Sequence, residues 1–109
     1  MASTYKVLAQ VNPSATTATT LYTCGSASGA VVSTISICNQ AASAGTYRVA
    51  VRPAGATLAA VHYIAYDIAI AANDTTALTL GVTLANTDVI TVYASAATMS
   101  FSAFGTELS

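Results

Sequence analysis

Apolar and polar residues alternate with a period of two along much of the chain. The clearest stretch is 46–52, in which the odd positions are Tyr47, Val49 and Val51 and the even positions are Arg48, Ala50 and Arg52. A period of two places the two sets of side chains on opposite faces of a strand, whereas a helix would need a period near 3.6. Many of these positions hold Thr, Val or Ile, whose branched side chains favour the pleated strand. The pattern therefore predicts half-buried β-strands.

Eight segments are predicted to be strands, at residues 4–11, 18–23, 30–38, 46–52, 61–67, 75–80, 88–94 and 98–104. Clusters of Gly, Pro, Asn and Asp separate most of them and indicate turns. At most one helical turn is expected, at 57–60 or 69–72. Short strands that follow one another without helices are typical of a sandwich. We expect an all-β fold, a single-domain antiparallel β-sandwich or jelly-roll-like domain of about eight strands spanning residues 1–109.

The alternation also predicts which side chains share a face at the two ends of the chain. In the first strand it groups Tyr5, Val7, Ala9 and Val11 on one face and Lys6, Leu8 and Gln10 on the other. In the last strand it groups Met99, Phe101 and Ala103 on one face and Ser100, Ser102 and Phe104 on the other.

Charge is scarce in this chain. Charged residues make up 6% of the sequence, against about 25% in an ordinary soluble domain. The seven are Lys6, Arg48, Arg52, Asp67, Asp74, Asp88 and Glu107. With a net charge of −1 and no basic cluster, the chain is not expected to bind nucleic acid.

Small neutral residues dominate instead, since Ala, Ser and Thr make up about half of the chain. Such side chains lose little conformational entropy when a partner covers them, and a net charge near zero favours association. We expect a surface that is packed in an assembly. The alternative is a stable monomer with a bias toward small residues.

The mean hydropathy of +0.62 raises the question of a membrane. The most apolar stretch, 49–72, is interrupted by Arg52, Pro53, Gly55, His62 and Asp67. No membrane-spanning helix is therefore predicted. Lys6 is not followed by a continuous apolar segment, so no secretory signal is expected.

The two cysteines, Cys24 and Cys38, are too few and too far apart in sequence to predict a metal site. If 20–24 and 30–38 form consecutive strands of one antiparallel hairpin, Cys24 pairs with a residue near position 30 and Cys38 lies far from it. We therefore expect no disulfide, with both cysteines acting as small apolar core residues.

Candidate catalytic chemistry is sparse. His62 is the single histidine, and in a strand Asp67 would lie on the opposite face from it. A general base needs a positioned partner, and the chain has no Gly-x-Ser-x-Gly motif for a nucleophile. We expect no enzyme, no cofactor and no metal, and interpret His62 as a surface or interface residue.

The candidate interface residues are Arg48, Arg52, His62, Tyr63 and Tyr66. Arg48 and Arg52 share one face of a predicted strand, about 13 Å apart. They either bind acidic groups on a partner or are simply solvated. Tyr47, Tyr63, Tyr66 and Tyr93 offer amphipathic area for an interface, and the alternative is that most of them are half-buried sheet residues.

Several segments together resemble a known class of protein. They include Met1 to Gln10, Leu21-Tyr22-Thr23, Tyr47 to Gly55, His62 to Asp67, Leu80 to Leu84, Thr87 to Ser95 and Phe101 to Gly105. This set is similar to small, nearly all-β virion proteins of tailed bacteriophages, especially phages of cyanobacteria and other aquatic hosts. The resemblance covers almost the whole chain and implies a structural protein of the virion, assembled in the host cytoplasm, with no catalytic residues.

Within a virion, the resemblance leaves two positions open. Head cement, or decoration, proteins are commonly short β-domains that form trimers and bind capsomer junctions. The expectation is therefore a cement protein that forms a homo-oligomer, with a trimer favoured, and binds the major capsid protein. The alternative is a tail-tip or tail-fibre protein that binds other tail proteins or the host surface, including its carbohydrates.

Overall fold

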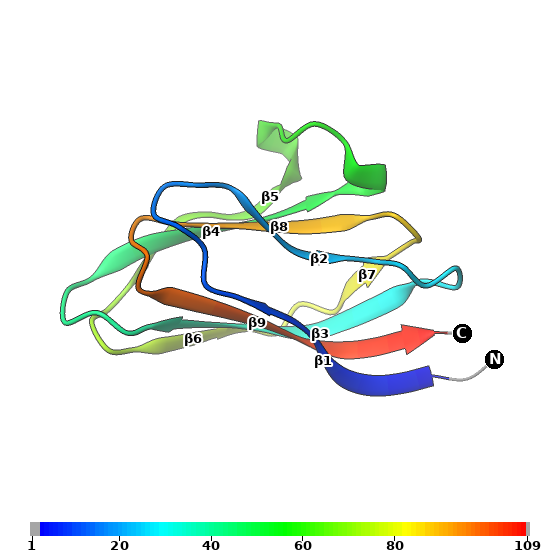
Figure 1. Ribbon diagram of the computed structural model, residues 1–109, viewed down its shortest axis with the longest axis horizontal. Coiled ribbons are helices and arrows are strands. Elements are labelled where there is room, and N and C mark those ends of the chain that lie inside the picture. The colour runs from blue at the N-terminus through cyan, green and yellow to red at the C-terminus, as the bar shows by residue number, and fades with distance from the viewer. Residues whose placement is uncertain (1–2, 109) are drawn as a thin grey trace.

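A computed structural model describes residues 3–108, and these fold into two β-sheets packed face to face (Figure 1). The strands are β1 (Ser3–Val11), β2 (Thr19–Thr23), β3 (Ala30–Asn39), β4 (Gly45–Arg52), β5 (Tyr63–Ile70), β6 (Thr75–Leu78), β7 (Val82–Leu84), β8 (Val89–Ala94) and β9 (Met99–Leu108). Two short 3₁₀ turns, η1 (Pro53–Gly55) and η2 (Ala60–His62), lie between β4 and β5. The predicted all-β sandwich is confirmed. Among the described residues, no helix is long and apolar enough to cross a membrane.

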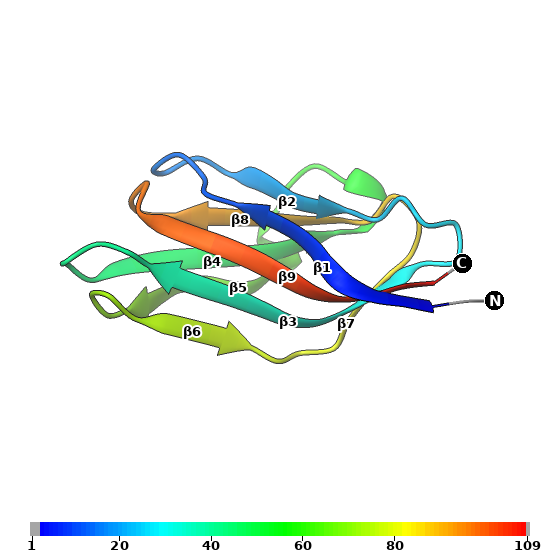
Figure 2. The ribbon, with the colours of Figure 1, turned by 60° about the horizontal axis from the view of Figure 1, so that its bottom comes forward.

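The strands pair in a nested order. β1 pairs with β9, β2 with β8, β3 with β6 and β7, and β4 with β5, all antiparallel. One sheet has the order β1-β9-β3-β6, with β7 also paired to β3, and lies at the front of Figure 2. The other sheet has the order β2-β8-β4-β5. Pairing from the two ends of the chain inward, with the pairs divided between two sheets, gives the jelly roll that was one of the predicted forms.

The predicted strand 75–80 is interrupted. The structure ends β6 at Leu78 and adds β7, a strand that the sequence pattern did not predict. Gly81, with φ +65°, lies between them, in a backbone region that glycine adopts without steric cost. Because β6 and β7 pair with successive parts of β3, they form one edge strand with a break, so nine strands stand where eight were predicted.

The interior is built from the alternating side chains of the central strands. Tyr47 and Val49 of β4 are fully buried, as are Met99, Phe101 and Ala103 of β9, which confirms that these side chains share a face as predicted and shows that the face points inward. The rings of Tyr47 and Phe101 meet edge to face across the two sheets, 6.4 Å between centroids. This arrangement suits the quadrupoles of two aromatic rings.

The predicted face of the first strand is wrong. A β-bulge interrupts the pairing of β1 with β9 between Val7 and Ala9. Leu8, Ala9 and Val11 pack against the core, whereas Tyr5 and Val7 are 82% and 49% exposed. An inserted residue reverses the alternation on one side of the bulge, so Tyr5 and Val7 lie on the outer face.

The predicted hairpin around Cys24 is also wrong, because β2 and β3 belong to different sheets. Cys24, directly after β2, is buried, and Cys38 on β3 is half-buried. Both are free thiols. The two cysteines form no disulfide, as expected, but the reason is that they lie in different parts of the sandwich and not in one hairpin. Cys38 is half-buried and is therefore not the core residue that was predicted.

Candidate functional site

The outer face of the four-stranded sheet carries a cluster around Arg48. Its members, called the Arg48 cluster below, are Arg48 on β4, Tyr63, Tyr66 and Asp67 on β5, and Tyr93 on β8. The Arg48 guanidinium donates two hydrogen bonds to the Asp67 carboxylate, Nε to Oδ1 at 2.6 Å and a terminal nitrogen to Oδ2 at 3.2 Å. This paired geometry matches the planar fork of arginine to a carboxylate.

Aromatic rings enclose the same guanidinium. The Arg48 Cζ atom lies 4.2 Å from the ring centroid of Tyr66 and 4.2 Å from that of Tyr93. Arg48 and Tyr93 are direct neighbours across β4 and β8. The negative faces of the rings attract the cation. The hydrogen bonds from Arg48 hold the pKa of Asp67 below its usual range, and the pKa of Arg48 is raised in return.

Two irregularities in β5 assemble this cluster. Tyr47 pairs with Ile68 and Val49 pairs with Ala65, so Tyr66 and Asp67 together stand opposite Arg48. Asp67 has φ +49°, the left-handed conformation that Asp tolerates better than most residues. A second register shift occurs between Val49 and Ala50. These bulges bring Tyr63 and Tyr66 together at 4.9 Å, edge to face.

Strict alternation would have placed Tyr63 and Tyr66 on opposite faces, since they are three residues apart. Both tyrosines and Arg48 were predicted from the sequence as interface residues, but their contact was not predicted. Tyr93 was also predicted from the sequence as a possible interface residue, whereas Asp67 was not. Within 88–94, Tyr93 alternates with the apolar Ile90 and Val92, so a period of two places it on the face opposite to theirs.

The segment 53–62 arches away from the four-stranded sheet (Figure 1). Arg52 anchors its start by donating to the carbonyls of Gly55 and Ala56 at 3.3 and 3.0 Å. The Asp88 carboxylate accepts from the N–H groups of Ala54 and Ala85, and these bonds hold its pKa below the usual range. Two charged side chains therefore fix the base of this segment.

The helical turns in this segment differ from the predicted ones. They lie at 53–55 and 60–62 rather than at 57–60, and residues 69–70 belong to β5. His62 ends the second turn, which corrects its predicted place within a strand. Its Nδ1 accepts a hydrogen bond from the N–H of Ala59 at 3.0 Å. No carboxylate of the described chain forms an ion pair with His62.

An open hollow of about 600 Å³ lies between this segment and β5. It is lined by Leu58, Ala59, Ala60, Tyr63 and Tyr66. Its volume falls within the usual range of small-molecule sites. The hollow adjoins the Arg48 cluster, because Tyr63 and Tyr66 belong to both.

Arg48 and Arg52 do project from the same strand, but neither guanidinium is free. Arg48 is bound to Asp67, and Arg52 donates to the Thr91 hydroxyl at 2.9 Å as well as to the loop carbonyls. The sequence suggested either that the two arginines bind acidic groups of a partner or that they are solvated. Both interpretations assumed that the guanidinium groups make no bonds within the chain. Their role in this structure is to position the chain's own aromatic rings and loop.

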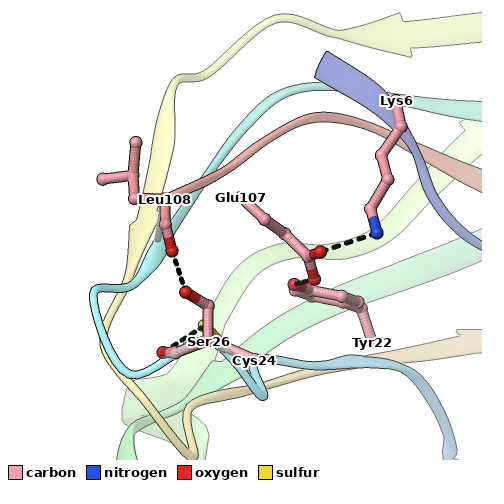
Figure 3. A network of polar contacts seen from close by, with 6 residues as sticks. All are labelled: Lys6, Tyr22, Cys24, Ser26, Glu107 and Leu108. Atoms are coloured by element: carbon pink, nitrogen blue, oxygen red, sulfur yellow. Dashed lines mark hydrogen bonds and ion pairs between the residues drawn. The ribbon is translucent and has the colours of Figure 1, made fainter. Parts of the chain in front are cut away.

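A second polar network closes the end of the sandwich near the described ends of the chain (Figure 3). Glu107 on β9 pairs with Lys6 on β1 at 2.7 Å and accepts a 2.5 Å hydrogen bond from the Tyr22 hydroxyl of the opposite sheet. Burial and the adjacent Glu107 raise the pKa of Tyr22, while Lys6 and Tyr22 lower that of Glu107. Beside it, the Ser26 hydroxyl donates to the Leu108 carbonyl.

The charged residues are thus satisfied within the chain. The remaining one, Asp74, accepts from the N–H of Thr75 at 2.8 Å. Residues 3–108 contain no group of three or more His, Cys, Asp or Glu side chains placed to hold a metal ion. Comparisons with protein-family models, with characterised proteins and with solved structures give no match to this chain. Its function is therefore argued from its own surfaces.

Proposed function

We propose that this protein is a non-enzymatic structural protein of a phage virion, acting as a capsid cement protein that stabilises capsomer junctions. The observation that carries the proposal is the outer face of the five-stranded sheet. Its five strands contain two charged residues, Lys6 and Glu107. These pair with each other, and Glu107 also bonds to Tyr22 of the opposite sheet, so the pair lies toward the inner side of the sheet. A partner can cover such a surface without desolvating an unpaired charge, which is the most costly part of burying a polar surface.

Part of this face is apolar. Tyr5 and Val7 of β1 are exposed, and Val7 is the direct cross-strand neighbour of Phe104, which is 36% exposed. We call these three residues the Tyr5 face. The strands beside it carry neutral polar groups, such as Gln10 and Ser102, which are hydrogen-bonded to each other at 3.2 Å. Exposed apolar residues surrounded by polar ones are typical of contact surfaces.

The dimensions suit a docking role. The protein measures 45 × 27 × 19 Å. Figure 1, drawn down the shortest axis, shows both sheets edge-on, so a sheet face spans the long and the short dimension. That area is comparable to the roughly 800 Å² that each partner contributes to a standard interface. The proposed occupants are the major capsid protein and further copies of this chain, with a trimer as the favoured oligomer.

Capsids assembled with and without the protein test this proposal. Decorated shells are expected to open at a higher temperature than bare ones, because separating the capsomers must also break the added interfaces. The double variant Tyr5→Ser/Phe104→Ser should lose both binding and protection. The variant Val61→Ser changes a residue that is 85% exposed in the 53–62 segment, and it should retain both. Equal opening temperatures for decorated and bare shells would refute the cement role.

A further inference from the structure

We infer that the hollow beside the Arg48 cluster binds a neutral saccharide. This inference does not rest on the cement proposal, because the hollow adjoins the four-stranded sheet and the Tyr5 face belongs to the other sheet. The chain uses most of its few charges to build the surroundings of this hollow. Four of the seven, Arg48, Arg52, Asp67 and Asp88, hold the rings and the loop around the hollow.

Contacts within the chain hold parts of both sides of the hollow in place. On one side, Arg52 and Asp88 anchor the base of the 53–62 segment, and the bond from Ala59 to His62 closes its last turn. On the other side, Arg48 packs against one face of the Tyr66 ring. A preformed site loses less entropy on binding than a loose one. Small-molecule sites are usually largely preformed.

The lining combines aromatic faces with hydrogen-bonding edges. The rings of Tyr63 and Tyr66 stand at 82° to each other and form a corner. Within residues 3–108, neither hydroxyl has a hydrogen-bond partner. A sugar ring has one face of C–H groups, which carry a slight positive charge and pack on the negative face of an aromatic ring. Its hydroxyl groups can exchange hydrogen bonds with the two tyrosine hydroxyls.

Several kinds of ring-shaped ligand could pack against the two tyrosine rings, and the charge of the residues around the hollow distinguishes between them. The lining residues are uncharged, and the adjacent Arg48 is neutralised by Asp67. An acidic sugar would meet no free cation there. A nucleotide would need unpaired basic groups for its phosphate. The arrangement therefore favours an uncharged sugar over both.

Titration of the intact protein with glucose, galactose and N-acetylglucosamine, and with disaccharides of each, tests the inference. The ring signals of the six tyrosines are followed by NMR. At least one neutral sugar is expected to shift Tyr63 and Tyr66 saturably while Tyr5 stays unchanged. The variant Tyr63→Ala, which leaves Arg48 between Tyr66 and Tyr93, should weaken binding about tenfold or more, as expected for loss of a central aromatic contact.

Two further variants complete the design. Tyr5→Ala removes an exposed tyrosine on the other sheet and should leave sugar binding unchanged. Ala60→Phe fills the hollow without removing any contact and should abolish binding even if Tyr63→Ala disturbs the fold. The inference is overturned if no neutral sugar gives a saturable shift up to about 50 mM, where a site with a Kd near 10 mM would be mostly filled. Tighter binding of glucuronic acid than of glucose would also overturn it.

Discussion

Arg48 and Asp67 face each other across β4 and β5, and two hydrogen bonds join guanidinium to carboxylate. The carboxylate reaches this position because Asp67 adopts φ +49° in a bulge. Strained backbone of this kind persists when its surroundings hold it in place. The pair and the bulge therefore stabilise each other, and they keep Tyr66 stacked on the outer face.

This mutual dependence predicts non-additive effects at the two positions. Arg48→Lys removes the fork and the planar stacking surface, while Asp67→Asn removes the charge but tolerates the left-handed backbone. Each single variant should unfold at a lower denaturant concentration than the wild type. Asp67→Asn should cost less in the Arg48→Lys background, because the partner is already lost. Strictly additive effects would show that the pair acts as two independent residues.

The hydroxyl of Tyr47 is buried and has no hydrogen-bond partner within residues 3–108. Burying an unpaired hydroxyl is unfavourable, and the same burial raises the pKa of this tyrosine. Tyr47→Phe should therefore raise the free energy of unfolding by about 1 kcal/mol. Tyr22→Phe makes the same chemical change but removes the bond to Glu107, so it should lower stability by about 1 kcal/mol. Chemical denaturation of both variants measures the opposite signs.

Gly105 marks a close approach between β9 and β3. A Cβ atom on Gly105 would lie 2.0 Å from the Val31 carbonyl oxygen and 2.9 Å from the Val32 Cα. Both neighbours are backbone atoms and cannot move aside without disturbing β3. Gly105→Ala should therefore destabilise the protein by about 2 kcal/mol or more. Gly25→Ala is the matched control, since its Cβ would meet nothing within 4 Å, and its thermal midpoint should stay close to that of the wild type.

Stability should fall at both extremes of pH. Asp67, Asp88 and Glu107 have lowered pKa values in the folded state, so their contribution is complete above the unfolded values near 4 and is lost as the pH falls through the lower folded values. The raised pKa of Tyr22 works in the opposite direction. Its contribution is complete below about pH 10 and is lost as the pH rises further.

Thermal midpoints measured from acid to alkaline pH should thus form a plateau with two falling limbs. Glu107→Gln should flatten both limbs, because Glu107 titrates in acid and contributes to the raised pKa of Tyr22. Asp74→Asn alters a turn carboxylate bonded to the N–H of Thr75 and should leave the alkaline limb unchanged. A Glu107→Gln profile identical to that of the wild type would contradict the assigned network.

The alternating pattern predicted the fold class correctly, and it grouped the side chains of β4 and β9 on the correct shared faces. These strands lie inside their sheets, with neighbours on both sides and one face on the core, so burial enforces the period of two. It failed at the edge strands β1 and β5, where bulges interrupt the pairing, and a register shift also occurs between the inner strands β3 and β9. At the edges an unpaired side permits bulges, and nothing in Tyr5, Val7 or Asp67 as residue types signals where one occurs.

The site was predicted less completely than the fold. Arg48, Tyr63 and Tyr66 were selected for their chemistry, but their meeting depends on pairing between β4, β5 and β8, which is a long-range property. Short-range pattern cannot specify which strands become neighbours. The engagement of Arg52 with Thr91 and the loop carbonyls depends equally on the 53–62 segment, whose shape no sequence signal indicated.

The central claim is that this nearly uncharged sandwich acts by covering junctions between capsid subunits. Cryo-electron microscopy of purified virions that carry the protein tests it most directly. Density for the sandwich is expected on the head, at junctions between capsomers, with Tyr5, Val7 and Phe104 buried against a neighbouring chain. Density found on the tail alone would contradict the cement role and select the tail-tip or fibre alternative.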